Sequence, residues 1–200
     1  MNAKKANEKD WLTGSDPSQM LMAIKDRSSD RKRRLFAVAS CRTVTEMIPA
    51  DQCWRVIDAA ERFADNPLAH DELQAARAQL LDWIELIYRQ EFEEVAWRRM
   101  VSEIGAIPVI VPQLSGTAWI LRDIFGNPFR QMAFDPKWRT EAAVGLALKM
   151  YDDRDFRAMP ILADALEEAG CDVAERLAHC REPGVHVRGC WVVDLVLGKG

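Results

Sequence analysis

Apolar side chains recur every three to four positions along most of this 200-residue sequence, and this spacing constrains the fold more than any other feature. It places the apolar residues on one side of an α-helix. The pattern is longest from Asp71 to about Glu103, a stretch without Gly or Pro in which Leu73, Leu80 and Ile84 share one side. The sequence therefore predicts a mainly α fold, a single-domain multi-helix bundle with one long central helix.

Helix start and stop signals divide the rest of the chain. Asp accepts free backbone N–H groups and Pro fits the first turn, so an Asp-Pro pair predicts a helix start. The apolar segment Trp191 to Leu197 is short enough for a strand or a helix, and we favour a helix because no strand partner is evident. The predicted helices begin at Asp16-Pro17, Asp30 (to Ile48), Asp51 (to Asn66), about Ser115 (to Phe125), Asp135-Pro136, Pro160 (to Gly170) and Asp172, where Glu175 completes the cap.

One domain is expected after a flexible polar tail over residues 1–14. Residues 15–200 would form a single helical domain with two sub-halves, 15–104 and 115–200, joined by 105–114. The joining segment is β-branched and bracketed by Pro108 and Pro112, so it is predicted to be an extended connector. Ile104 to Leu121 is uncharged and approaches membrane-span length, but its Gly and Pro residues would be poor in lipid, and no membrane partner is expected.

Charge and cysteine content limit the partners and the compartment. A net charge of −4 gives no general attraction to nucleic acid or anionic lipid. The basic run Arg31 to Arg34 would suit phosphates, but we predict a solvated face paired with neighbouring acids, and nucleic-acid binding is not favoured. Five cysteines without a secretion signal predict a cytoplasmic protein with reduced thiols.

The strongest candidate site is a cluster of His179, Cys180, His186 and Cys190 within twelve residues. Imidazole nitrogens and thiolates are preferred ligands of zinc, and four of them would close a tetrahedral site. The spacing is not that of a standard zinc finger. Neighbouring residues on a helix point about 100° apart, so His179 and Cys180 would not easily both bind one ion. Cys171 or Cys41 is then the alternative fourth ligand.

We favour a simpler interpretation of the same residues over a metal site. Cys171, Cys180 and Cys190 fit the pattern of small core residues, and the histidines would then form hydrogen bonds in a loop shaped by Pro183-Gly184. A catalytic Cys–His pair is less favoured, since the nearest carboxylate that could orient it is Asp194. Because apolar residues surround Asp194, it is predicted to be buried and to form a structural ion pair with Arg188, or else with Arg181.

Several long segments of the sequence are distinctive: Leu121 to Arg130, Pro160 to Cys171, His179 to Arg181 and Gly189 to Leu195, with Ser29 to Lys32, Leu35 to Ala37 and Cys41-Arg42. These segments resemble an uncharacterised family abundant in planctomycete genomes. The similarity covers most of the chain and is weakest over residues 71–118. It implies kinship without a mechanism, since that family has no established activity. Relatives tend to have Cys-x-Cys-Cys-Arg where this chain has Val38 to Arg42, so any metal site formed by those cysteines is depleted here.

Two functional hypotheses follow. The abundance of helical patterns and the lack of a complete catalytic motif favour a non-enzymatic helical module that binds a protein partner. The alternative is a zinc-binding domain, structural or catalytic, that uses the His/Cys cluster at 179–190.

Overall fold

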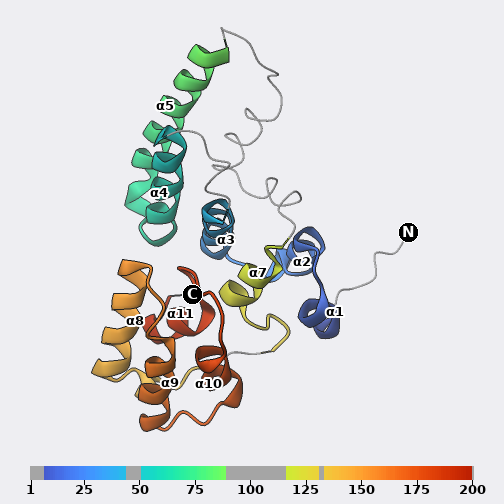
Figure 1. Cartoon of the computed structure of the whole chain (residues 1–200), viewed down its shortest axis with the longest axis vertical. Helices are drawn as coiled ribbons and strands as arrows, with labels where there is room; N and C mark the ends of the chain where they lie inside the picture. The colour runs from blue at the N-terminus through green and yellow to red at the C-terminus, as the bar shows by residue number, and fades with distance from the viewer. Residues whose placement is uncertain (1–6, 44–50, 89–115, 131–132, 200) are drawn as a thin grey trace. The chain divides into compact units, whose positions relative to one another are not determined.

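The computed structural model describes residues 7–43, 51–88, 116–130 and 133–199, and these residues form helices and loops without a strand (Figure 1). The predicted mainly α, multi-helix class is confirmed. The chain divides into two compact units, Gly14–Ala118 and a second that combines Met1–Thr13 with Trp119–Gly200. None of the described helices is long and apolar enough to cross a bilayer.

The unit Gly14–Ala118 follows the predicted start signals. Asp16 accepts hydrogen bonds from the backbone N–H groups of Ser18 and Gln19, and Gln19 Nε2 donates back to its carboxylate. The long helix is described as far as Tyr88; the rest of its predicted course, the predicted connector and the end of the helix from Asp30 lie outside the described residues. The elements are α2 (Pro17–Ala23), η1 (Lys25–Arg27), α3 (Asp30–Arg42), α4 (Asp51–Asp65), η3 (Pro67–Ala69) and α5 (His70–Tyr88).

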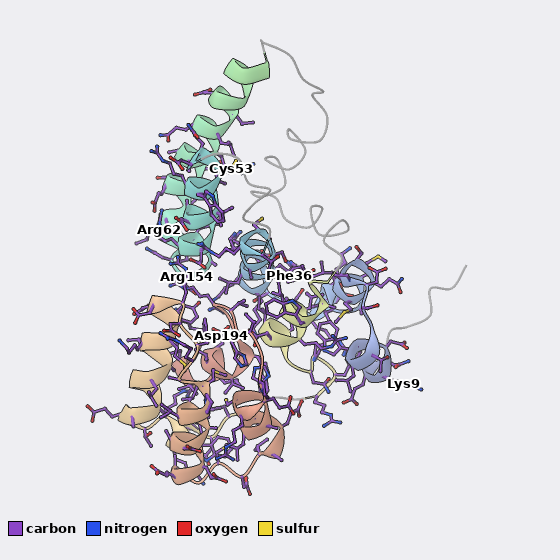
Figure 2. The ribbon with its side chains drawn as sticks, in the orientation of Figure 1. Lys9, Phe36, Cys53, Arg62, Arg154 and Asp194 are labelled. Carbon is purple, nitrogen blue, oxygen red and sulfur yellow. The ribbon has the colours of Figure 1, made fainter. Side chains whose placement is uncertain are left out.

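Helix α4 packs against both α3 and α5 in this unit. The apolar core among these three helices includes Cys53 of α4, which is labelled in Figure 2 and is 2% exposed. Part of the basic run pairs with acids: Arg31 Nε donates to Asp65 Oδ1 at 2.9 Å, and Arg33 pairs with Asp30. The predicted solvated face is not found as such, because Arg31 is 14% exposed and the Arg34 guanidinium lies over the Phe63 ring. The expectation that the chain does not bind nucleic acid stays a prediction.

The second unit contains α1 (Glu8–Thr13), α7 (Ala118–Phe125) except its first residue, η5 (Pro136–Trp138), α8 (Glu141–Asp153), α9 (Met159–Glu168), α10 (Ala174–Arg181) and α11 (Trp191–Leu197). Its core lies among α8, α9, α10 and α11. The last segment is helical, as favoured from the sequence. Gly170 adopts φ +86° just after α9, a left-handed conformation that ends the helix as predicted.

Two predicted helix starts need correction. Asp135-Pro136 opens only the short turn η5, while α8 begins after Thr140, whose hydroxyl accepts from the backbone N–H of Ala143 at 3.2 Å. The cap predicted at Asp172 does not form; Val173 occupies that position, without a side-chain hydrogen bond. The helix cap lies five residues after the predicted position at α8 and one residue after it at α10.

The predicted flexible tail also differs from the structure. Residues 8–13 form α1, and Trp11 is only 2% exposed. Its indole N–H donates to the carbonyl oxygen of Gly126 at 2.9 Å, 115 residues further along the chain. A helix of six residues is too short to show an apolar period in the sequence. It is also too short to be stable alone, so it depends on this tertiary contact.

Candidate metal centre

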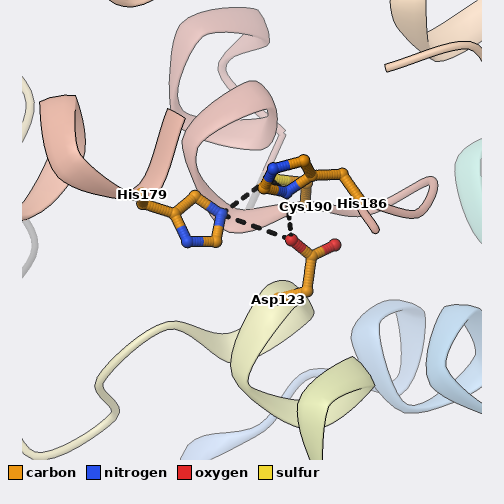
Figure 3. Close-up of side chains that lie close together, drawn as sticks. All are labelled: Asp123, His179, His186 and Cys190. Atoms are coloured by element: carbon orange, nitrogen blue, oxygen red, sulfur yellow. Dashed lines mark hydrogen bonds and ion pairs between the residues drawn. The ribbon is translucent and has the colours of Figure 1, made fainter. Parts of the chain in front are cut away.

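Four side chains from separate segments of the second unit converge on one point (Figure 3). Asp123 lies on α7 and His179 in the last turn of α10. His186 lies in the loop between α10 and α11, and Cys190 is the residue before α11. Each offers one donor atom, and these four atoms lie within 4.8 Å of one another.

The closest contacts join His179, His186, Cys190 and Asp123 to each other. His179 Nε2 lies 3.2 Å from Cys190 Sγ and 3.3 Å from Asp123 Oδ1. His186 Nδ1 lies 2.6 Å from the same Asp123 oxygen and 3.9 Å from Cys190 Sγ. Each ring therefore turns one nitrogen toward both the carboxylate and the thiol.

The orientation of Asp123 is fixed from the opposite side of its carboxylate. Asp123 Oδ2 accepts a hydrogen bond from the backbone N–H of Val187 at 2.9 Å. This contact ties α7 to the loop that carries His186, and it leaves Oδ1 facing the two imidazole rings. A ligand carboxylate held by a hydrogen bond on its second oxygen is typical of metal sites.

Aromatic neighbours restrict the two imidazole rings. The ring centroids of His179 and Trp191 are 5.2 Å apart, and those of His186 and Phe156 are 6.4 Å apart. The two histidine rings meet edge to face at 4.9 Å. These contacts hold the rings in the converged arrangement with little freedom to rotate.

Burial and the neighbouring charges set the protonation of the cluster. Burial alone would raise the pKa of Asp123, but hydrogen bonds with His179 and His186 outweigh it and bring that pKa below its ordinary value. Burial raises the pKa of Cys190 well above its ordinary value and the Asp123 charge raises it further, while backbone N–H groups of Val193 and Val192 oppose the shift. Without a cation, Cys190 is thus a neutral thiol.

The predicted ligand set is brought together in part. His179, His186 and Cys190 belong to the converging group, whereas Cys180 does not. Cys180 is 1% exposed and lies in the apolar core, where burial raises its pKa to about 12. The 100° between neighbouring helix positions directs His179 into the cluster and Cys180 into the core. The alternative fourth ligands also lie outside this group, since Cys171 is in the same core and Cys41 is in the core of the other unit.

Asp123 is the ligand candidate that sequence reasoning missed. It lies 63 residues before His186, so no local spacing connects them. The sequence carries only a weaker form of the signal that singles out Asp194: Leu121, Ile124 and Phe125 lie near Asp123, but its immediate neighbour is the charged Arg122. A carboxylate in such a setting must find cations or several N–H donors.

The predicted ion pair between Asp194 and Arg188 stays a prediction. Asp194 is 1% exposed on α11, as its apolar neighbours indicated. The Arg188 guanidinium lies over the Tyr151 ring, with Cζ 4.5 Å from the ring centroid. Arg181, the alternative partner, donates hydrogen bonds to Asp164 and Glu167 instead.

Comparison with known proteins adds no assignment to this geometry. No family model, curated protein or solved structure matches the chain. The resemblance to the planctomycete family therefore stays a prediction.

Proposed function

We propose that the second unit is a zinc-binding helical domain in which Asp123, His179, His186 and Cys190 hold one structural Zn²⁺ ion. The observation that carries this proposal is the convergence of one donor atom from each residue within 4.8 Å of the others. The donor set is two imidazole nitrogens, one thiolate and one carboxylate oxygen, all of which zinc accepts.

The distances suit a tetrahedral ion. Bonds of about 2.0–2.1 Å to nitrogen or oxygen and 2.3 Å to sulfur place neighbouring ligands about 3.3–3.6 Å apart. The contacts of His179 at 3.2 and 3.3 Å lie close to this value, and that of Cys190 with His186 at 3.9 Å lies slightly above it. Among these four contacts, the direct hydrogen bond between His186 and Asp123 at 2.6 Å deviates most, and these two atoms would have to separate by about 0.7 Å.

The same geometry argues against a catalytic Cys–His–Asp arrangement. In such a triad one ring nitrogen faces the nucleophile and the other faces the carboxylate. Here His179 turns Nε2 toward both Cys190 and Asp123, and His186 likewise turns only Nδ1. Cys190 is also fully buried with a raised pKa, whereas a nucleophilic cysteine needs access and thiolate character.

A structural role fits better than a catalytic one because four protein ligands complete a tetrahedral shell. Catalytic zinc sites keep one position for water or substrate. The side chains of Asp123 and His186 are 5% and 8% exposed and that of His179 is 21% exposed, so three of the four ligands, Cys190 included, are buried from any substrate. The ion would join α7, α10, the following loop and the start of α11. Reduced thiols, as in a cytoplasm, are required for this role.

Elemental analysis tests the proposal. The full chain, purified without an affinity tag and dialysed against zinc-free buffer, should retain about one zinc per chain, since structural sites bind tightly. Cys190→Ala should lose the metal. Cys180→Ala is the matched control, because it removes an equally buried thiol outside the cluster and should retain zinc.

Two results would contradict the proposal. One is less than about a tenth of an equivalent of zinc in the wild-type chain after exposure to zinc and dialysis, because a structural site binds zinc tightly enough to keep it. The other is loss of zinc in Cys180→Ala with retention in Cys190→Ala. The hypothesis of a protein-interaction module stays a prediction, and it is compatible with a structural zinc site because zinc would only stabilise the helical surface.

A further inference from the structure

We infer that Trp11 positions the Asp123 ligand, so that docking of α1 and occupancy of the metal centre stabilise each other. This inference rests on the proposed function. Trp11 does not touch the four donor atoms; it would act through α7, the helix that carries Asp123. It is therefore a positioning residue rather than a ligand.

The contacts of Trp11 lie on both sides of Asp123 in sequence. Its indole N–H donates to the Gly126 carbonyl at 2.9 Å, at the end of α7. In return the Arg122 guanidinium donates to the Trp11 carbonyl through Nη2 at 3.0 Å and Nε at 3.3 Å. The Trp11 and Phe125 rings meet edge to face with centroids 6.5 Å apart. Backbone and side-chain contacts together fix the last turn of α7.

A second set of contacts extends this connection past the end of α7. Asn127, 3% exposed, donates from Nδ2 to Glu8 Oε1 at 2.6 Å. Arg130 Nε donates to the same Glu8 oxygen at 2.6 Å. Asn127 Oδ1 accepts from the backbone N–H of Phe129 at 3.0 Å, so its amide is oriented from both ends. Helix α1 thereby contacts α7 and the turn that follows it.

The coupling follows from the position of α7 within this unit. Helix α7 carries Asp123, which faces the metal centre and accepts a hydrogen bond from the backbone N–H of Val187. Trp11 holds the end of the same helix through its hydrogen bond to Gly126. A zinc ion that fixes Asp123 therefore favours the α7 position that α1 recognises. Thermodynamic linkage requires the reverse effect to be equal in size.

Trp11→Phe tests the first direction because it keeps an aromatic ring beside Phe125 and removes the indole N–H. We expect the zinc dissociation constant, measured by competition with a chromophoric chelator, to rise about fivefold or more, the lower end of typical coupling energies. Trp138→Phe is the matched control: this tryptophan is also buried in the unit, and its Nε1 has no hydrogen-bond partner in the described part of the chain. Circular dichroism of each variant verifies that helix content is retained.

Trypsin cleavage after Lys9 tests the second direction on the unmutated chain. Lys9 is exposed on α1 (Figure 2), but cleavage there requires α1 to unwind. Zinc should slow release of the fragment ending at Lys9, followed by mass spectrometry, by about the same factor as the affinity change. In Cys190→Ala, zinc should leave this rate unchanged.

The outcomes separate the two claims. If the wild type binds zinc, but Trp11→Phe binds it equally well or zinc leaves cleavage at Lys9 unchanged, the positioning role is refuted while the proposed metal centre stands. If the wild type binds no zinc, the proposed function fails and the inference fails with it. An equal loss of affinity in Trp138→Phe would also overturn the specific role of Trp11.

Discussion

Zinc should raise the thermal stability of the wild-type chain and of Cys180→Ala, but hardly that of Cys190→Ala. At a free zinc concentration 100 times the dissociation constant, binding to the folded state adds about 2.7 kcal/mol to the free energy of unfolding. For a chain of 200 residues, 1 kcal/mol changes Tm by about 2–4 °C. The expected rise in Tm with zinc is therefore about 5–11 °C.

The loss of zinc-dependent stabilisation in Cys190→Ala follows from the share of the zinc-binding free energy that one ligand contributes. Structural zinc binds with about 10–16 kcal/mol, so each of four ligands contributes about 2.5–4 kcal/mol if they share it equally. Loss of Cys190 then weakens binding by roughly two to three orders of magnitude at the same zinc concentration. The remaining stabilisation is about half a kcal/mol or less, and the zinc-dependent change in Tm is no more than about 2 °C.

Differential scanning calorimetry with and without buffered zinc provides the measurement. Both alanine variants should have a lower Tm than the wild type without zinc, because each removes a buried sulfur atom. Only the response to zinc should separate them. A rise of 5 °C or more in Cys190→Ala, or the absence of a rise in the wild type at saturating zinc, would refute the reasoning, since about 2 °C is the upper limit expected for a missing ligand.

Three further predictions concern the same unit. Cobalt bound in place of zinc should give the visible absorption of a tetrahedral site with a thiolate ligand, and Cys190→Ala should lose it; an octahedral spectrum would contradict the proposed shell. Arg139→Met should lower the free energy of unfolding by about 1 kcal/mol, because the guanidinium donates to the carbonyl oxygens of Leu195 and Val196 at the end of α11; urea denaturation measures this, and an unchanged midpoint would exclude the capping role. Gly170→Ala should lower the free energy of unfolding by about 1–2 kcal/mol because φ at this position is +86°, whereas Gly145→Ala within α8 should raise it by about 1 kcal/mol. Urea denaturation measures both, and equal effects of the two substitutions would show that backbone conformation is not the cause.

The sequence predicted most helices because their signals are local. Asp16 and Gln19 are three residues apart, and Gly170 lies two residues after Glu168, the last residue of the helix that it ends. Residues 8–13 resemble a tail in the sequence because a six-residue helix has too few apolar positions to show a period. The contacts that stabilise this helix, such as the hydrogen bond from Trp11 to Gly126, join residues more than a hundred positions apart, which the local sequence cannot indicate.

The candidate site was predictable to the extent that its residues are close in sequence. His179, His186 and Cys190 lie within twelve positions, so their residue types alone suggested a metal. Asp123 comes from a different helix, and only the tertiary fold brings it there. Helix geometry already indicates that His179 and Cys180 would not both bind one ion, but which of the two faces the cluster depends on how α10 packs in the fold.

The contact between Trp11 and Gly126 also bears on how the protein folds during synthesis. The compact unit is discontinuous in sequence, since Met1–Thr13 joins Trp119–Gly200. At roughly 5–20 residues per second, the ribosome needs about 6–23 s to add the 115 residues that separate Trp11 from its partner. Throughout that interval Trp11 lacks the carbonyl to which it donates in the folded chain. Helix α1 is therefore translated well before the end of α7, yet it can reach its native place only after that end has been made.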